Sequence, residues 1–402
     1  MVIGIIGAGA SGMAAALTAA AHRDVQVLLF ERQARVGRKL QATGNGRCNL
    51  SNSNTSVQRY HGEHPEFSGY ALRCYDVANT LAWFSAMGLY TVTEESGKVY
   101  PYSDQANSVV DVLRFALQRD NIQLISGTEI TRVRKMESGF ELRTEAEYYH
   151  CDRLIIACGG LAGTKLGGSM SGYKLLRGLG HSCSRLRPAL VQLKSDWNGC
   201  VSLKGVRANC HAAIYCNGNL HSQSTGELQF TDYGISGPVI FEISRDVCQG
   251  SGSWMCRLDF LPNMQEDTLR TELLRRRETN LSTEELLTGI LHNRLGRVLT
   301  ATAGVRCKDC AALSDSDVDA LIKVVKSLEI SLTDTLGMDS AQVTAGGILT
   351  AEFNAETMES RLVPGLFACG EVLDIDGDCG GYNLQWAWSS GRLAGESAGG
   401  ML

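Results

Sequence analysis

The chain has 402 residues, of which 44% are hydrophobic and 20% charged, and its formal net charge is -5. This balance is typical of a globular protein of two or three domains and excludes overall attraction to nucleic acid or to an anionic membrane. No apolar run reaches the roughly 18 residues of a membrane-spanning helix. Because Met1 leads straight into an apolar strand without the basic start of a signal peptide, we expect a cytoplasmic protein.

The strongest local pattern lies at the N-terminus and predicts a strand, a tight turn, a helix and a second strand. Val2–Ile6 are nearly all apolar, as in a strand buried on both faces. The turn that follows reads G-x-G-x-x-G. Gly7 permits the turn, Gly9 allows a pyrophosphate to approach, and Gly12 allows the helix to pack on the strand. The helix N-terminus attracts phosphate, and Glu31 ends the second strand where a carboxylate can bind a ribose. The unit predicts dinucleotide binding; the alternative is a plain Gly-rich turn.

Residues 40–52, LQATGNGRCNLSN, have no apolar period and cannot form a core strand or an amphipathic helix. Their Asn, Thr and Arg side chains and the backbone N–H groups beside two glycines can surround a flavin ring edge, ribityl chain and phosphates. Arg38 and Lys39 add cations just before this loop. The alternative is a solvated surface loop.

Two later segments favour FAD over NAD. An apolar strand within residues 152–160 ends in a Gly pair, and residues 365–395 predict a strand, an acidic turn, Gly380–Gly381 and a closing helix. A site assembled from both chain ends suits FAD, because its flavin half needs binding residues of its own. No second strand, G-x-G-x-x-G turn, helix and acid occur in order, so we expect no separate NAD(P)H domain.

The fourteen cysteines are expected to be free thiols, because the chain is long and lacks a signal peptide. The one C-x-x-C pair, Cys307 and Cys310, lacks the second pair or the nearby histidines of a structural zinc site, so no metal is predicted. A redox pair stays open, but two incidental helix cysteines are favoured. The basic run Arg275–Arg277 is expected to form a solvated helix face rather than a nucleic-acid patch.

Six motifs run over nearly the whole chain: IGAGASGMAAA at its start, GRKLQATGNGRCNLSN (37–52), GKVYPYSDQANSVVDVL (97–113), GELQFTDYGISGPVI (226–240), VTAGGI (343–348) and TMESRLVPGLFACGEVLDIDGDCGGYNLQWAWSSG (357–391). Together they resemble the bacterial FAD flavoproteins of the aminoacetone-oxidase family, which includes bile-acid 7-dehydroxylation reductases. Among its departures from that family, residues 164–173 read TKLGGSMSGY and lack the usual Asp. The resemblance by itself therefore does not identify the substrate of this chain.

The resemblance implies an α/β fold with a Rossmann-like FAD-binding domain of the two-dinucleotide-binding type. That domain comprises residues 1–190 and 341–402. The inserted domain, residues 191–340, contains a β-barrel and a small helical bundle. The sequence agrees, since short strands and turns alternate over 191–262 and helical patterns dominate 263–330.

The resemblance also implies which residues bind FAD. At the adenosine and phosphate half it places Gly7, Gly9, Ala10, Ser11, Gly12, Glu31, Arg32, Lys39 and Ile130. At the ribityl chain and the flavin ring it places Thr43, Gly44, Asn45, Arg47, Cys48, Asn49, Glu371, Gly381, Tyr382, Asn383 and Leu384. The Gly-containing strand ends described above add Ala157, Gly159 and Gly370. A thiol beside a flavin can form adducts, but a packing role is favoured for Cys48.

The flavin carries the redox chemistry, so the expected reaction is hydride transfer between its N5 atom and a small organic substrate. Molecular oxygen, NAD(P)H or another carrier then completes the cycle. The helix that begins near Gly381 stabilises the reduced, anionic flavin with its positive end. No acid–base residue is identified; Tyr100, Tyr102, His181 and Tyr233 are candidate polar groups. Two other classes stay open: a flavin-dependent RNA-modifying enzyme, and a flavoprotein that binds or senses.

Overall fold

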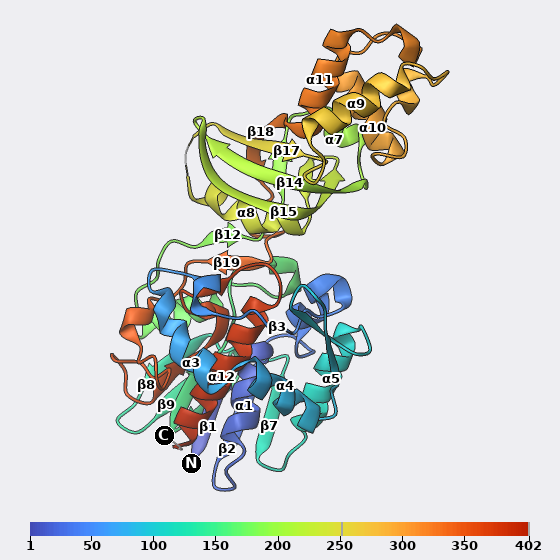
Figure 1. Cartoon of the computed structure of the whole chain (residues 1–402). Helices are drawn as coiled ribbons and strands as arrows, with labels where there is room; N and C mark the ends of the chain where they lie inside the picture. The colour runs from blue at the N-terminus through green and yellow to red at the C-terminus, as the bar shows by residue number, and fades with distance from the viewer. Residues whose placement is uncertain (251, 401–402) are drawn as a thin grey trace. The chain divides into compact units, whose positions relative to one another are not determined.

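The computed structural model describes residues 1–250 and 252–400, and the chain divides into two units (Figure 1). Unit 1 comprises Met1–Pro188 and the chain from Gln342 onward, and unit 2 comprises Ala189–Ala341. Each unit has its own hydrophobic core. None of the helices in the described part is both long and apolar enough to cross a membrane.

A five-stranded parallel sheet forms the centre of unit 1, in the order β20, β11, β1, β2, β7. Its strands are Val2–Ile6 (β1), Gln26–Glu31 (β2), Ile122–Ser126 (β7), Arg153–Ile156 (β11) and Leu366–Ala368 (β20). The first strand lies in the middle, which is the order of a Rossmann-type sheet, and ligands of such sheets bind at the carboxyl ends of the strands.

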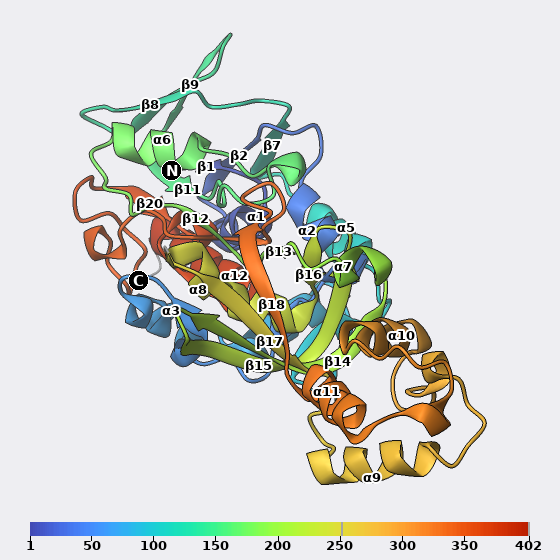
Figure 2. The same cartoon turned by 90° about the horizontal axis from the view of Figure 1, so that it is seen from above.

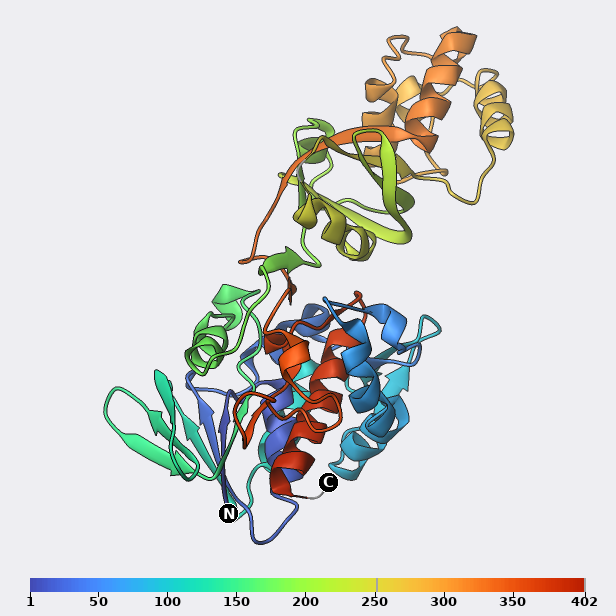
Figure 3. The same ribbon diagram turned by 90° about the vertical axis from the view of Figure 1, so that its left-hand side faces the viewer.

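Two long helices cover one face of this sheet (Figure 3): α1 (Ala10–Ala19) and α12 (Tyr382–Gly399). They pack closely because glycines of α12 face the backbone of α1. A Cβ atom built on Gly391 would lie 2.3 Å from the carbonyl oxygen of Ser11, and one on Gly395 would lie 2.4 Å from that of Ala15. The N-terminal and C-terminal segments of the chain are thereby joined in one layer.

A three-stranded antiparallel sheet covers the opposite face (Figure 3). Its strands are Arg132–Lys135 (β8), Phe140–Arg143 (β9) and Tyr148–Cys151 (β10). Here too a glycine allows the contact, because a Cβ atom on Gly4 of β1 would lie 2.8 Å from the Sγ atom of Cys151. Unit 1 is therefore a three-layer structure.

Shorter elements surround these layers. The helices are Arg38–Ala42 (α2), Ser68–Cys74 (α3), Val77–Ala86 (α4), Ala106–Ala116 (α5) and Ser171–Gly178 (α6). Three strands form a small antiparallel sheet, namely Ser51–Asn52 (β3), Lys98–Pro101 (β6) and Thr91–Thr93 (β5). Two further pairs are Tyr60–His61 (β4) with Asp376–Gly377 (β21), and Arg187–Ala189 (β12) with Val343–Ala345 (β19).

Unit 2 contains a closed six-stranded barrel and a group of helices (Figure 2). The barrel strands are Leu193–Ser195 (β13), Arg207–Cys216 (β14), Asn219–Thr231 (β15), Gly234–Ser236 (β16), Trp254–Asp259 (β17) and Leu328–Thr335 (β18). The helices are Gly199–Ser202 (α7), Pro238–Gln249 (α8), Glu266–Arg276 (α9), Asn293–Thr302 (α10) and Asp315–Lys326 (α11). The predicted α/β class, a Rossmann-like domain with an insert of barrel and helices, is confirmed.

The barrel differs from its prediction in two respects. Strands β14 and β15 have 10 and 13 residues and are not short. Helix α8 occupies a stretch that was predicted to contain only strands and turns. It begins at Pro238, which suits the first position of a helix, and it buries Val239, Ile240 and Ile243 against the barrel core. Apolar residues at this spacing fit one face of a helix, a pattern that the strand prediction overlooked.

The basic run Arg275–Arg277 of unit 2 forms ion pairs, and the cysteine pair of this unit lies outside the α-helices. Arg275 and Arg276 form ion pairs with Glu272 on their own helix, and Arg277 pairs with Asp315. Cys310 begins a short 3-10 turn, and Cys307 precedes it in a loop, so the pair does not lie in an α-helix. Within residues 1–250 and 252–400, no group of three His, Cys, Asp or Glu side chains is placed to hold a metal ion.

Candidate dinucleotide site

The turn between β1 and α1 is crowded on one side and open on the other. Gly7 has φ +105°, and a Cβ atom on it would lie 2.5 Å from the carbonyl oxygen of Ala157. A Cβ atom on Gly12 would lie 1.8 Å from the carbonyl oxygen of Gly7. In contrast, a Cβ atom on Gly9 would meet no atom within 4 Å. Gly9 is also the N-cap of α1, and no side chain caps this helix. The geometry therefore leaves space for a phosphate at the first N–H groups of α1.

Glu31 connects this turn to the end of β2. Its Oε2 atom accepts a hydrogen bond of 2.9 Å from the N–H of Ala8, and its Oε1 atom accepts one of 2.8 Å from the N–H of Gln33. Two carboxylate oxygens have about four lone-pair sites, so acceptor capacity remains for the ribose contact, which stays a prediction. The neighbouring Arg32 donates a 2.6 Å hydrogen bond to the carbonyl oxygen of Gly167. Arg32 thus binds the segment in which the sequence departs from its family.

The loop at residues 43–49 is compact because several of its residues adopt left-handed backbone conformations. The φ angles are +57° at Gly44, +56° at Asn45, +86° at Gly46 and +62° at Cys48. Glycine accepts this region without steric cost, and Asn tolerates it better than most residues. This requirement explains the two glycines and Asn45 of the loop.

Cys48 lies in the hydrophobic core of unit 1 with no exposed surface. The resemblance placed it on the flavin side, whereas its buried position agrees with the packing role that was favoured. Burial raises the pKa of the Cys48 thiol to about 12. The thiol is therefore neutral at physiological pH, and a neutral thiol is a poor nucleophile.

Iodoacetamide at mildly alkaline pH should consequently leave Cys48 unmodified in the folded protein, while it modifies Cys74, which is exposed at the end of α3. Peptide mass spectrometry measures both products. Modification of both cysteines in urea provides the control. If Cys48 reacts as fast as Cys74 in the folded protein, its burial is wrong.

The start of α12 packs against the loop that follows Cys48. The Asn52 side chain donates a 2.8 Å hydrogen bond to the carbonyl oxygen of Gly380, and the Ser51 hydroxyl donates one of 2.6 Å to Gln385. A Cβ atom on Gly381 would lie 2.7 Å from the Oδ1 atom of Asn49. That Oδ1 atom is buried and has no hydrogen-bond partner among the residues that the structure describes. Such an atom costs about 1–3 kcal/mol when it stays unpaired, so a ligand N–H group would fit it.

An ion pair links Lys39, which precedes the loop, to Glu371 in the C-terminal segment. Lys39 Nζ lies 2.8 Å from Glu371 Oε2, and Glu371 Oε1 accepts a 2.8 Å hydrogen bond from the N–H of Thr344. Gly160, after β11, closely approaches this carboxylate, since its Cβ atom would lie 2.4 Å from Oε1. A Cβ atom on its neighbour Gly159 would meet none of the described atoms within 4 Å. A second open glycine therefore lies near the Lys39–Glu371 pair.

The structure thus places Gly7, Glu31 and Gly159 at or just beyond the carboxyl ends of parallel strands. Arg47 differs, because its guanidinium forms ion pairs with Glu94 and Asp104 and lies 4.0 Å from the ring centroid of Tyr100. It anchors the loop to the β5–β6 sheet. His181 is held in a buried network in which its ring nitrogens lie 2.8 Å from Glu352 and 3.0 Å from the Ser360 hydroxyl.

Comparison with known proteins supports the same family. The model of the HI0933-like protein Rossmann domain matches residues 1–397. The 3-dehydro-bile acid delta(4,6)-reductase of Clostridium scindens is 40% identical over 407 residues, which cover 98% of each chain. The ribosomal RNA dihydrouridine synthase of Escherichia coli is 32% identical over 389 residues, which cover 96% of this chain and 95% of that enzyme. A solved structure of E. coli quinol fumarate reductase aligns with 99% of this chain and 70% of its own, at a TM-score of 0.49 and 17% identity. The chain therefore belongs to the HI0933-like family, which confirms the resemblance to FAD flavoproteins drawn from its motifs, and its class is that of a flavin-dependent oxidoreductase.

Proposed function

We propose that the chain binds FAD and reduces a carbon–carbon double bond conjugated to a carbonyl group in a small organic substrate. The observation that carries the cofactor assignment is the pairing of two distant features in unit 1. One is the open glycine turn at Gly9, and the other is the unpaired buried oxygen of Asn49 beside Gly381. These features suit the phosphates and the ring of one extended dinucleotide.

The reaction type follows from what the names of the two relatives have in common. One name describes a reductase of a 3-dehydro bile acid with double bonds at positions 4 and 6, and the other describes an enzyme that forms dihydrouridine. In both cases a double bond conjugated to a carbonyl gains two hydrogens. The proposal takes a small molecule as substrate because the relative with 40% identity acts on one.

Different residues of the site hold different parts of the cofactor. The N–H groups at the start of α1 bind the pyrophosphate, and Glu31 binds the adenosine ribose. Asn49 accepts a hydrogen bond from the flavin ring, while the N-terminus of α12, which begins after Gly381, stabilises negative charge there. The bound flavin supplies the hydride.

The purified protein should be yellow and should release one non-covalent FAD per chain on acid treatment, as measured by chromatography. After anaerobic reduction with dithionite, a 3-oxo bile acid with double bonds at positions 4 and 6 should reoxidise the flavin and gain the mass of two hydrogens. The matched saturated 3-oxo bile acid should do neither. Released FMN, a covalent flavin or bound NAD alone would contradict the cofactor assignment. Failure of every conjugated carbonyl compound to reoxidise the flavin would contradict the reaction.

The second candidate is reduction of uridine in ribosomal RNA, and the 32% identity to the E. coli enzyme over 96% of this chain favours it. The net charge of -5 and the acidic partners of Arg275–Arg277 weigh against RNA binding. The two candidates are separated by incubation of the reduced protein with unmodified ribosomal RNA. Formation of dihydrouridine, detected by nucleoside mass spectrometry, would replace the small-molecule proposal.

A further inference from the structure

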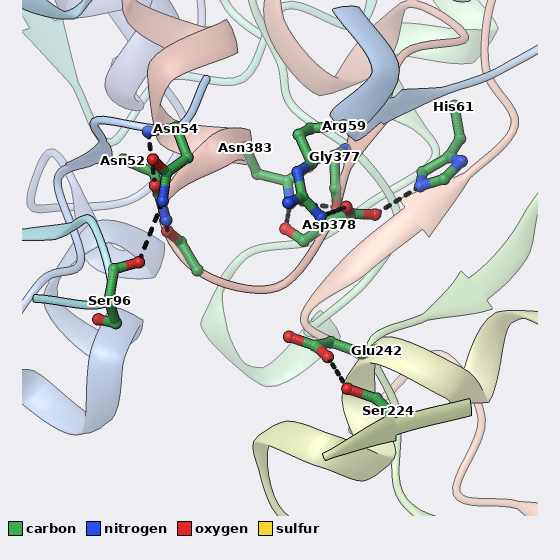
Figure 4. Close-up of polar contacts among 11 residues, drawn as sticks. Asn52, Asn54, Arg59, His61, Ser96, Ser224, Glu242, Gly377, Asp378 and Asn383 are labelled. Carbon is green, nitrogen blue, oxygen red and sulfur yellow. Dashed lines mark hydrogen bonds and ion pairs between the residues drawn. The ribbon is translucent and has the colours of Figure 1, made fainter. Parts of the chain in front are cut away.

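A histidine–aspartate pair lies at the short β4–β21 sheet of unit 1, with His61 on β4 and Asp378 just after β21. In this sheet His61 is opposite Asp376. The Nε2 atom of His61 lies 2.7 Å from Asp378 Oδ1, and the Nη1 atom of Arg59 lies 3.3 Å from Asp378 Oδ2 (Figure 4). One carboxylate therefore holds an imidazole and a guanidinium at the same time. None of these three side chains was identified as a candidate from the sequence.

This sheet is attached directly to the first turn of α12. Asn383 accepts a 2.8 Å hydrogen bond from the N–H of Gly377 and donates one of 2.8 Å to its carbonyl oxygen (Figure 4). The Tyr60 hydroxyl donates a 3.0 Å hydrogen bond to the carbonyl oxygen of Tyr382. The histidine–aspartate pair is thus fixed to the helix end that is expected to face the flavin.

The pair has the arrangement of a proton donor with its orienting group. The His61 side chain is 35% exposed and that of Asp378 is 27% exposed, so both are partly covered and the imidazole keeps some contact with solvent. Because the carboxylate accepts from Nε2–H, the proton of the protonated ring that can be transferred is on Nδ1. Nδ1 has no hydrogen-bond partner within the described part of the chain. A carboxylate that orients an imidazole in this way also stabilises the imidazolium form.

We propose that His61 donates the proton in the reduction proposed above, on which this inference rests, and that Asp378 is a positioning residue. When bound and reduced, the flavin would supply a hydride to the β-carbon of the conjugated double bond and would lose two electrons. The π electrons of the substrate move toward the carbonyl group. The α-carbon then takes the Nδ1 proton, and the electron pair of the broken N–H bond stays on Nδ1. Water returns a proton to His61, so atoms and electrons balance.

The first test measures single-turnover flavin reoxidation by the 4,6-diene 3-oxo bile acid. H61Q should slow this step by about 100-fold or more, which is the usual contribution of a general acid. D378N should slow it less, because the proton donor remains. Both variants should keep one FAD per chain. H64Q is the matched control: His64 lies three residues along, is 54% exposed and pairs with Glu66, so its substitution should leave the rate unchanged.

The pH dependence separates proton donation from a structural role. The charged groups around His61 are Asp376 opposite it on β21, Asp378 and Arg59. The wild-type reoxidation rate should fall as the pH rises, because a neutral ring has no proton to give from Nδ1. The rate of H61Q should not show this fall. Added imidazole should restore part of the rate to H61A and none to D378N. An unchanged rate and pH profile in H61Q would overturn the proposal.

A second measurement needs no flavin turnover. A proton donor to the α-carbon also catalyses the reverse step, which is deuterium exchange at the α-carbons of a saturated 3-oxo bile acid in D2O. The oxidised wild-type protein should accelerate this exchange, as followed by NMR, and H61Q should not. Exchange that depends on His61 without any flavin reoxidation by the diene would retain the proton role and reject the reduction. Reoxidation that is unaffected by H61Q, with no catalysed exchange, would retain the reduction and reject the role of His61.

Discussion

Replacement of Gly9 with valine should give a folded protein that has lost most of its FAD. A Cβ atom at this position meets no protein atom within 4 Å, so the chain itself does not oppose the substitution. The branched side chain would instead fill the space in which the pyrophosphate approaches the first N–H groups of α1. The measurements are the ratio of flavin to protein absorbance after purification and the affinity for added FAD.

Gly178 offers a matched control for this variant. It lies at the exposed end of α6, and a Cβ atom on it also meets no atom within 4 Å. Gly178→Val should therefore retain one FAD per chain and the same circular dichroism spectrum. If Gly9→Val is soluble, folded and fully loaded with FAD, the turn serves only the fold, and the phosphate site must be sought elsewhere.

Substitution of Gly12 by alanine should instead lower the free energy of unfolding. The new Cβ atom would lie 1.8 Å from the carbonyl oxygen of Gly7, so α1 would have to move away from the end of β1. Overpacking of this kind costs about 1–3 kcal/mol and sometimes more, and here the obstructing atom belongs to the backbone. We expect a free energy of unfolding lower by roughly 3 kcal/mol in urea titrations followed by circular dichroism.

The same substitution at Gly178 controls for the general effect of alanine. Because that position is open, Gly178→Ala should change the free energy of unfolding by no more than about 1 kcal/mol, the difference in helix propensity between the two residues. A urea midpoint of Gly12→Ala equal to that of the wild type would show that the close approach of α1 to β1 is not required.

The amino-acid sequence by itself determined the N-terminal half of the candidate site. The strand, turn and helix at Val2–Ala19 follow from local rules, since an apolar run, three spaced glycines and an alanine-rich segment each restrict the backbone within a few residues. The distinct roles of Gly7 and Gly12 were predicted for the same reason. The motifs also identified the family and the barrel-containing insert, because each motif is a contiguous string.

Only the tertiary structure decided which distant residues meet. Asp378 is 317 positions from His61, and Gln385 is 334 positions from Ser51, so no local pattern relates them. The burial of Cys48 was likewise undetermined, because a loop residue faces inward or outward according to what packs over it. Arg47 pairs with carboxylates just after β5 and beyond β6, namely Glu94 and Asp104, which no pattern in its own loop indicates. Local sequence restricts backbone conformation, whereas pairing and burial depend on contacts that form only when the whole chain has folded.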